Sequence, residues 1–116
     1  MTAARLRLGS RGEDRAAAWY RSNGYEILDR NWRCRDGELD LVCRRGGTLV
    51  FSEVKTRSSL AYGHPAEAVT PNKQRKVRQV ARRWLGERED SWRPEEIRFD
   101  VVAVLPGQVD VIEAAF

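Results

Sequence analysis

The residues best suited to chemistry are three charged side chains in the segment GELDLVCRRGGTLVFSEVKTR, residues 37–57. Asp40 lies in its first half, and Glu53 and Lys55 lie in its second half. Because alternate residues of a β-strand share a face, Glu53 and Lys55 lie on one face if the second half is a strand. Carboxylates could hold a divalent cation there, and an ammonium could hold a phosphate oxygen or position an attacking water.

The turn between the two halves decides whether Asp40 meets Glu53. If the Gly-Gly pair at 46–47 is a two-residue hairpin loop, the numbers of paired residues sum to 93, and Asp40 lies opposite Glu53. Two carboxylates directly across a sheet destabilise it, and apolar residues flank this pair. We therefore expect a cation between them, since opposed Cβ atoms about 4.5–5.5 Å apart leave room for Mg²⁺ coordinated at about 2.0–2.1 Å. The alternative is an edge hairpin with exposed charges, in which Lys55 pairs with Glu38.

The other metal-binding residue types restrict the identity of the cation. The chain has one histidine, His64, and two cysteines, Cys34 and Cys43, which have no metal-ligand spacing. A zinc cluster cannot be built from this set, and a disulfide is not expected in a reducing compartment. The ligands would be oxygens, so the expected cofactor is Mg²⁺ or Mn²⁺.

The elements that would position these residues follow from periodicity, turns and caps. The sequence predicts helices over 10–23 and 70–86 and strands over 25–33, 37–45, 48–56, 97–105 and 109–112. A loop over 58–69 carries His64. The order αβββαββ indicates an α/β domain with a mixed sheet and flanking helices, spanning 1–116 with a core at about 9–113.

Glu13, in the first predicted helix, has two interpretations that can coexist. Its spacing from Ser10 is that of a capping box, in which Ser10 is the N-cap. Glu13 also shares a helical face with Ala16, Ala17 and Tyr20, the face expected on the sheet, so its carboxylate could reach the metal directly or through water.

Positive charge is concentrated on the second predicted helix. Residues 73–88 carry a net charge of +6, whereas the rest of the chain carries −2. Such a row suits the phosphates of a polyanion, and the alternative is a solvated helix face. The candidate phosphate-binding residues are Lys73, which is expected to face the site, Arg57, for which we expect the same role, and Arg75, Lys76, Arg78 and Arg82.

The remaining candidates have simpler interpretations. His64 reads as an ordinary loop residue, Asp100 as a local ion pair with Arg98, and the four tryptophans as packing residues. No apolar run approaches the length of a membrane span, and the N-terminal segment lacks the apolar stretch of a signal peptide. These features favour a soluble, cytoplasmic protein.

Four stretches of the chain together resemble a known family. They are GSRGEDRAAAWYRSNGYEILDRNWRCRDGELDLV, FSEVKTR, GHPAEAVTPNKQRKVRQVARRWL and IRFDVVAV, covering roughly residues 9–105. The chain resembles the YraN-like family of small bacterial proteins regarded as endonucleases. That family is related to the archaeal Holliday-junction resolvases in the PD-(D/E)XK nuclease superfamily.

The resemblance implies a restriction-endonuclease-like core and a Mg²⁺-dependent nuclease acting on structured or branched DNA. Asp40 matches the motif aspartate, Glu53 and Lys55 match the E-x-K element, and Glu13 matches the first-helix acid. The residue before Asp40 is Leu39 instead of the motif's proline, which the superfamily tolerates. DNA junctions with two-fold symmetry suit dimeric proteins, so the resemblance also implies a possible homodimer of this chain.

Two other function classes remain open at this point. The domain could be a module of the same fold that binds nucleic acid without cutting it. It could also be a protein–protein adaptor whose basic helix contacts a partner. DNA affinity would separate the first from the second, and metal-dependent turnover would separate an enzyme from both.

Overall fold

The computed structural model describes residues 3–58 and 69–116, with side chains described from residue 11 onward in these ranges. Along the chain lie α1 (Ala3–Ser22), β1 (Glu26–Cys34), β2 (Gly37–Arg45), β3 (Thr48–Thr56), α2 (Pro71–Gly86), β4 (Glu96–Leu105) and β5 (Gln108–Ile112). The predicted order αβββαββ and the bounds of β2 and β3 are confirmed, and β1, β4 and β5 begin one residue from the predicted positions.

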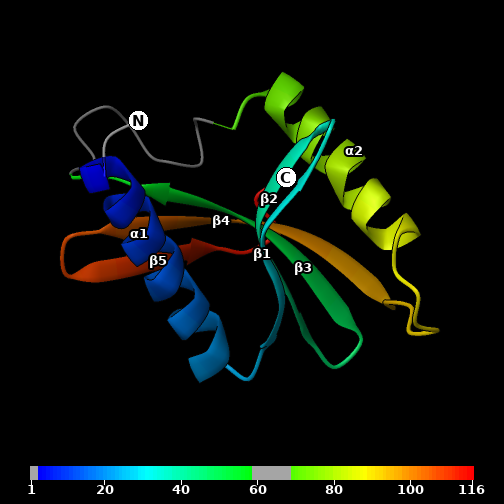
Figure 1. The fold of residues 1–116 in the computed structure, drawn as a ribbon. Coiled ribbons are helices and arrows are strands. Elements are labelled where there is room, and N and C mark those ends of the chain that lie inside the picture. The colour runs from blue at the N-terminus through cyan, green and yellow to red at the C-terminus, as the bar shows by residue number, and fades with distance from the viewer. Residues whose placement is uncertain (1–2, 59–68) are drawn as a thin grey trace.

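The five strands form one mixed sheet in the order β1-β2-β3-β4-β5. Neighbouring strands are antiparallel except β3 and β4, which are parallel and are connected through α2. The mixed α/β fold is therefore confirmed. Figure 1 shows the strongly twisted sheet with α1 and α2 on its two sides.

Each helix covers one face of the sheet with its own apolar cluster. On one face, α1 packs Ala16, Ala17 and Tyr20 against residues that include Leu41 and Val50. On the other face, the predicted apolar stripe of α2 packs against residues that include Phe51 and Phe99; its buried members are Val77, Val80, Ala81 and Trp84. Alternate residues of β3 thus enter different clusters, as strand geometry requires.

The predicted start of the first helix is wrong. Helix α1 begins at Ala3, so Ser10 and Glu13 both lie inside it and Ser10 is not an N-cap. The segment AARLRL consists of strong helix formers, and they extend the helix through Gly9 and Gly12 despite a cost of about 1 kcal/mol for each glycine. The capping-box interpretation of Glu13 is therefore wrong.

The prediction of an Asp100 ion pair is confirmed. Asp100 is fully buried, and both of its oxygens accept hydrogen bonds from the Arg98 guanidinium, at 2.8 and 2.9 Å. It also accepts hydrogen bonds from the Tyr20 hydroxyl at 2.7 Å and from the Ala114 backbone at 3.0 Å. This network ties α1 and the C-terminal segment to β4.

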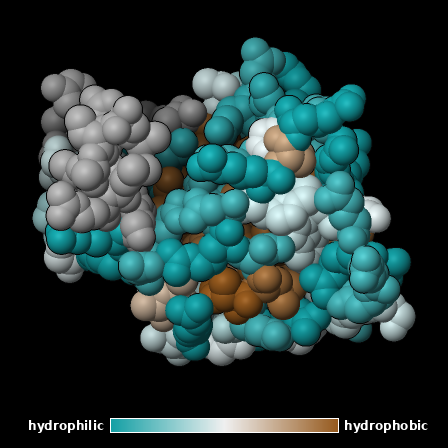
Figure 2. All heavy atoms as spheres, viewed as in Figure 1, coloured by the Kyte–Doolittle hydropathy of each residue, from teal (hydrophilic) through white to brown (hydrophobic). Residues whose placement is uncertain are grey.

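Two further expectations concern the surface and the loop. The face shown in Figure 2 is mostly hydrophilic, as expected for a chain with 33% charged residues. No helix within the described ranges is long and apolar enough to cross a membrane. The predicted loop at 58–69, with His64, lies almost entirely outside the described residues.

Candidate metal and nucleic-acid site

Strands β2 and β3 pair in the predicted register. Arg45 pairs with Thr48 across the turn at 46–47, and the paired numbers sum to 93 as far as Leu41 and Ser52. The next pair would be Asp40 with Glu53, but the backbone ladder stops before it.

Asp40 itself explains why the ladder stops. Its Oδ2 accepts a hydrogen bond from the backbone N–H of Val54 at 2.8 Å, so a side-chain oxygen replaces the carbonyl that would otherwise continue the ladder. The register, together with the repulsion that Asp40 exerts on Glu53, puts the two carboxylates near each other at the point where the two strands separate.

Strand β1, which pairs with β2 on its other edge, is irregular at the residue opposite Asp40. Arg30 pairs with Leu41 and Trp32 with Leu39, which places Asn31 opposite Asp40. Asn31 has a φ of 52°, in the left-handed region that asparagine tolerates better than most residues. Sequence reasoning missed Asn31, whose only signal was an asparagine inside a strand.

Asn31 connects this site to the first helix. Its side-chain Nδ2 donates a hydrogen bond to Glu13 Oε2 at 2.6 Å, and the Arg30 guanidinium lies 3.9 Å from the same oxygen. The Glu13 side chain is 17% exposed. The structure therefore places Glu13 near Asp40, whose charge acts on it, and whether Glu13 reaches a metal stays a prediction.

Gly12 permits the close approach of α1 that places Glu13 there. A Cβ atom built on Gly12 would lie 2.1 Å from Oγ1 of Thr56, the last residue of β3. A side chain at position 12 would push the helix away from the strand. This contact was also missed, because a glycine inside a helix indicates lower helix stability and does not name its neighbour.

Glu53 is the most buried acid of the cluster, with 5% of its side chain exposed, and two ammonium groups flank it. Lys55 Nζ lies 3.9 Å and Lys73 Nζ lies 3.8 Å from Glu53 Oε2. Lys73 is held in the first turn of α2, where its backbone N–H donates to the N-cap Thr70. The expectation that Lys73 faces the site is confirmed.

All three carboxyl groups are electrostatically disfavoured as anions. Burial raises the pKa of Asp40 above its usual value, and the nearby Glu38 charge adds to this. Burial, followed by repulsion from Asp40, raises the pKa of Glu53. Burial also raises the pKa of Glu13, with a further contribution from Asp40. A divalent cation among these groups would offset both effects.

The donor set fits such a cation. Asp40 and Glu53 supply carboxylate oxygens, and Asp40 Oδ1 accepts no hydrogen bond from the described residues. Within those same residues no group of three or more acidic, histidine or cysteine side chains is placed to hold a metal ion. Mg²⁺ does not need one, because it is commonly bound through one or two carboxylates and keeps several waters.

The alternative pairing of Lys55 with Glu38 is not observed in the described parts of the chain. Glu38 instead forms an ion pair at the surface with Arg33, whose Nε lies 2.9 Å from Glu38 Oε2. Lys55 is thereby left beside Glu53.

The other predicted phosphate-binding residues spread away from the acids. Arg57, Arg75, Lys76 and Arg82 are exposed or partly exposed, and Lys76 lies beside Glu38 in a shallow pocket. Arg78 stacks on Phe99, with 4.6 Å from its guanidinium carbon to the ring centre. Arg83 is neutralised by Asp36 at 3.2 Å and Glu87 at 3.5 Å.

Comparisons with known proteins identify relatives along almost the whole chain. The model of the uncharacterised protein family UPF0102 matches residues 12–104. A UPF0102 protein of Beutenbergia cavernae is 58% identical over 98 residues, which cover 84% of this chain and 81% of the relative. Another from Rhodococcus opacus strain B4 is 50% identical, covering 96% and 97%. One from Chlorobaculum parvum is 48% identical, covering 89% and 78%.

Proposed function

The chain belongs to the uncharacterised protein family UPF0102, and we propose that it is a metal-dependent nuclease that hydrolyses phosphodiester bonds of DNA. One observation carries the proposal: Asp40 and Glu53 lie together where β2 and β3 separate, with the Lys55 and Lys73 ammonium groups beside Glu53. The buried Glu53 and the half-buried Asp40, next to two cations, could hold a metal and a phosphate.

We further propose that the fold is a restriction-endonuclease-like core of the PD-(D/E)XK superfamily. Support comes from where the acids sit. Asp40 lies on the middle strand of the β1–β2–β3 meander, Glu53 and Lys55 lie near the end of the next strand, and Glu13 approaches from α1.

Each residue has a role in this proposal. Asp40 and Glu53 would hold Mg²⁺ or Mn²⁺, which when bound polarises a phosphate and lowers the pKa of a water. Lys55 stabilises negative charge that develops on the phosphate. Lys73 holds a neighbouring phosphate oxygen, and Glu13, oriented by Asn31, positions the attacking water.

A cleavage assay tests the proposal. Purified protein is incubated with linear, nicked, flapped and four-way DNA in Mg²⁺ or Mn²⁺, in parallel with Asp40→Asn and Glu53→Gln. The matched control is Glu26→Gln, which removes an exposed carboxylate that pairs with Arg44 at the far end of β1. We expect cleavage by the parent and the control, and none by the two site variants or in chelator.

The other function classes predict different results. DNA binding without metal-dependent cleavage would reject the nuclease and favour a binding module. Absence of both would favour the adaptor. Cleavage that persists in Asp40→Asn would assign the activity to a contaminant or to another site.

A further inference from the structure

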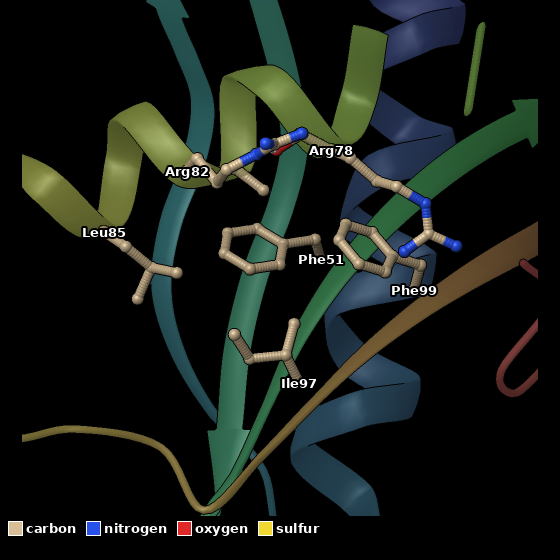
Figure 3. Close-up of a pocket in the computed structure, with 7 residues that line it drawn as sticks. Phe51, Arg78, Arg82, Leu85, Ile97 and Phe99 are labelled. Atoms are coloured by element: carbon tan, nitrogen blue, oxygen red, sulfur yellow. Dashed lines mark hydrogen bonds between the residues drawn. The ribbon is translucent and has the colours of Figure 1, made fainter. Parts of the chain in front are cut away.

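A pocket on the α2 side of the sheet lies outside the acidic site. Its volume is about 350 Å³. Figure 3 shows Arg78, Arg82 and Leu85 reaching from α2, and Phe51, Ile97 and Phe99 rising from β3 and β4. We call it the Phe51 pocket. Ile97 is 43% exposed and is the only exposed large hydrophobic residue among the side chains that the structure describes.

The chemistry of the pocket combines flat aromatic rings with guanidinium groups. The Phe51 and Phe99 rings are stacked with centres 5.6 Å apart, and Arg78 lies over Phe99. None of its lining residues is acidic. An arginine stacked on a ring keeps its N–H donors free at the edge. Both rings are buried, with Phe51 1% and Phe99 8% exposed, so the accessible apolar surface belongs to Leu85 and Ile97. The pocket therefore suits a small apolar group with a neighbouring anion.

The pocket and the proposed nuclease site lie on the same face of the sheet. Phe51 and Glu53 are alternate residues of β3, so their side chains leave the same face about 7 Å apart. On α2, Arg75, Arg78 and Arg82 follow each other at helical spacing, and Arg82 lies about 13 Å along the axis from Lys73. A strand whose phosphate lies at Glu53 and Lys73 could run along these arginines to the pocket.

We propose that the Phe51 pocket binds an unpaired base of the DNA. This base lies on the same strand as the phosphate at the nuclease site and close to it. This rests on the proposed function, because it takes DNA as the ligand, and it assigns the substrate class as DNA with an unpaired nucleotide. The base packs against the accessible Leu85 and Ile97 side chains, over the buried Phe51 and Phe99, and Arg78 and Arg82 hold its flanking phosphates. A paired base cannot enter, because its faces are covered by its neighbours in the duplex.

The size and charge of the pocket favour this occupant over a second copy of the chain. A volume of about 350 Å³ is at the lower end for small-ligand sites and fits one ring system better than a protein surface. Arginines at its rim would also repel the same basic helix of another copy.

Binding to matched duplexes tests the inference separately from cleavage. Fluorescence anisotropy in chelator compares a fully paired duplex with the same duplex carrying one unpaired nucleotide. We expect the parent protein to prefer the second by about 10-fold, which corresponds to about 1.4 kcal/mol from burying one base. Asp40→Asn should keep this preference, because it leaves the pocket intact.

Three variants identify the pocket as its source. Ile97→Glu places a carboxylate at the exposed mouth and should abolish the preference while retaining affinity for the paired duplex. Arg82→Gln should reduce the preference, whereas Arg83→Gln, with the same charge change on the neutralised side of α2, should not. Thermal melts confirm that each variant is folded.

Equal affinity of the parent for both duplexes, or a preference that survives in Ile97→Glu, would overturn the inference. A dimer in sedimentation velocity that Ile97→Glu dissociates, without any base preference, would show an interface instead and also overturn it. A preference without cleavage would support the pocket and reject the nuclease. Cleavage without a preference for the unpaired base would support the nuclease and reject the pocket.

Discussion

Replacing Asp40 with asparagine separates a metal site from a structural charge. The fold disfavours the anionic form of Asp40, whose pKa is raised mainly by burial. Asparagine keeps the shape, and its Oδ1 can still accept from the Val54 N–H. Without metal, we therefore expect Asp40→Asn to match the parent or exceed it by about 0.2–1 kcal/mol, the range for cross-strand charge pairs.

Added metal should stabilise the parent more than it stabilises Asp40→Asn. A ligand that binds only the folded state at 100 times its Kd adds about 2.7 kcal/mol. For a domain of this size, that raises Tm by about 10 °C. The parent should show this shift with Mn²⁺, and Asp40→Asn should show little of it because one of the two carboxylate ligands has lost its charge.

The assay is a set of melting curves in chelator and across a Mn²⁺ titration. Glu26→Gln is the control, because it also removes one carboxylate but from an exposed pair 3.1 Å from Arg44. It should shift with Mn²⁺ as the parent does. Suppose instead that Asp40→Asn is clearly less stable in chelator and the parent does not respond to Mn²⁺. Asp40 would then be a structural residue, and the metal site would be refuted.

Three further predictions test the surroundings of the site. The raised pKa values of Asp40, Glu53 and Glu13 mean that the folded state binds protons more tightly than the unfolded state. In chelator, urea titrations should therefore show the parent gaining stability relative to Asp40→Asn as the pH falls from neutral through these values, and a flat difference would contradict this. Gly12→Ala should destabilise the protein by up to about 2 kcal/mol, because overpacking against Thr56 costs about 1–3 kcal/mol and the higher helix propensity of alanine offsets about 1 kcal/mol of it. Adding Thr56→Ala should restore the stability in the same denaturation assay; failure of the rescue would exclude this contact. Asp100→Asn should cost about 3–5 kcal/mol with or without Mn²⁺, because it leaves the half-buried Arg98 with only the exposed Glu113, 3.7 Å away, as an anion; calorimetry in both conditions checks that the loss is independent of metal.

The register of β2 and β3 was predictable because a two-residue glycine turn leaves one pairing, and hydrophobic alternation agrees with it. The start of α1 was not, because the capping signal at Ser10 competes with a segment of strong helix formers that precedes it. Sequence placed Glu13, Asp40, Glu53 and Lys55 in the cluster. It did not predict Asn31 or Gly12, because a left-handed residue in a strand and a close contact between distant segments depend on the packed structure.

The same fold contains two buried acidic centres, and their difference is the strongest argument for a site at Asp40 and Glu53. Asp100 receives hydrogen bonds from a guanidinium, a hydroxyl and a backbone N–H. Glu53, almost as buried, accepts no hydrogen bond in the described ranges and has two ammonium groups at 3.8 and 3.9 Å. This chain can therefore satisfy a buried carboxylate fully where only stability is at stake. At Glu53 the cations stand off from the carboxylate, and Asp40 adds a second negative charge to the same place. A structural role would favour closing those gaps, whereas a site that must admit a cation and a phosphate has to keep them open.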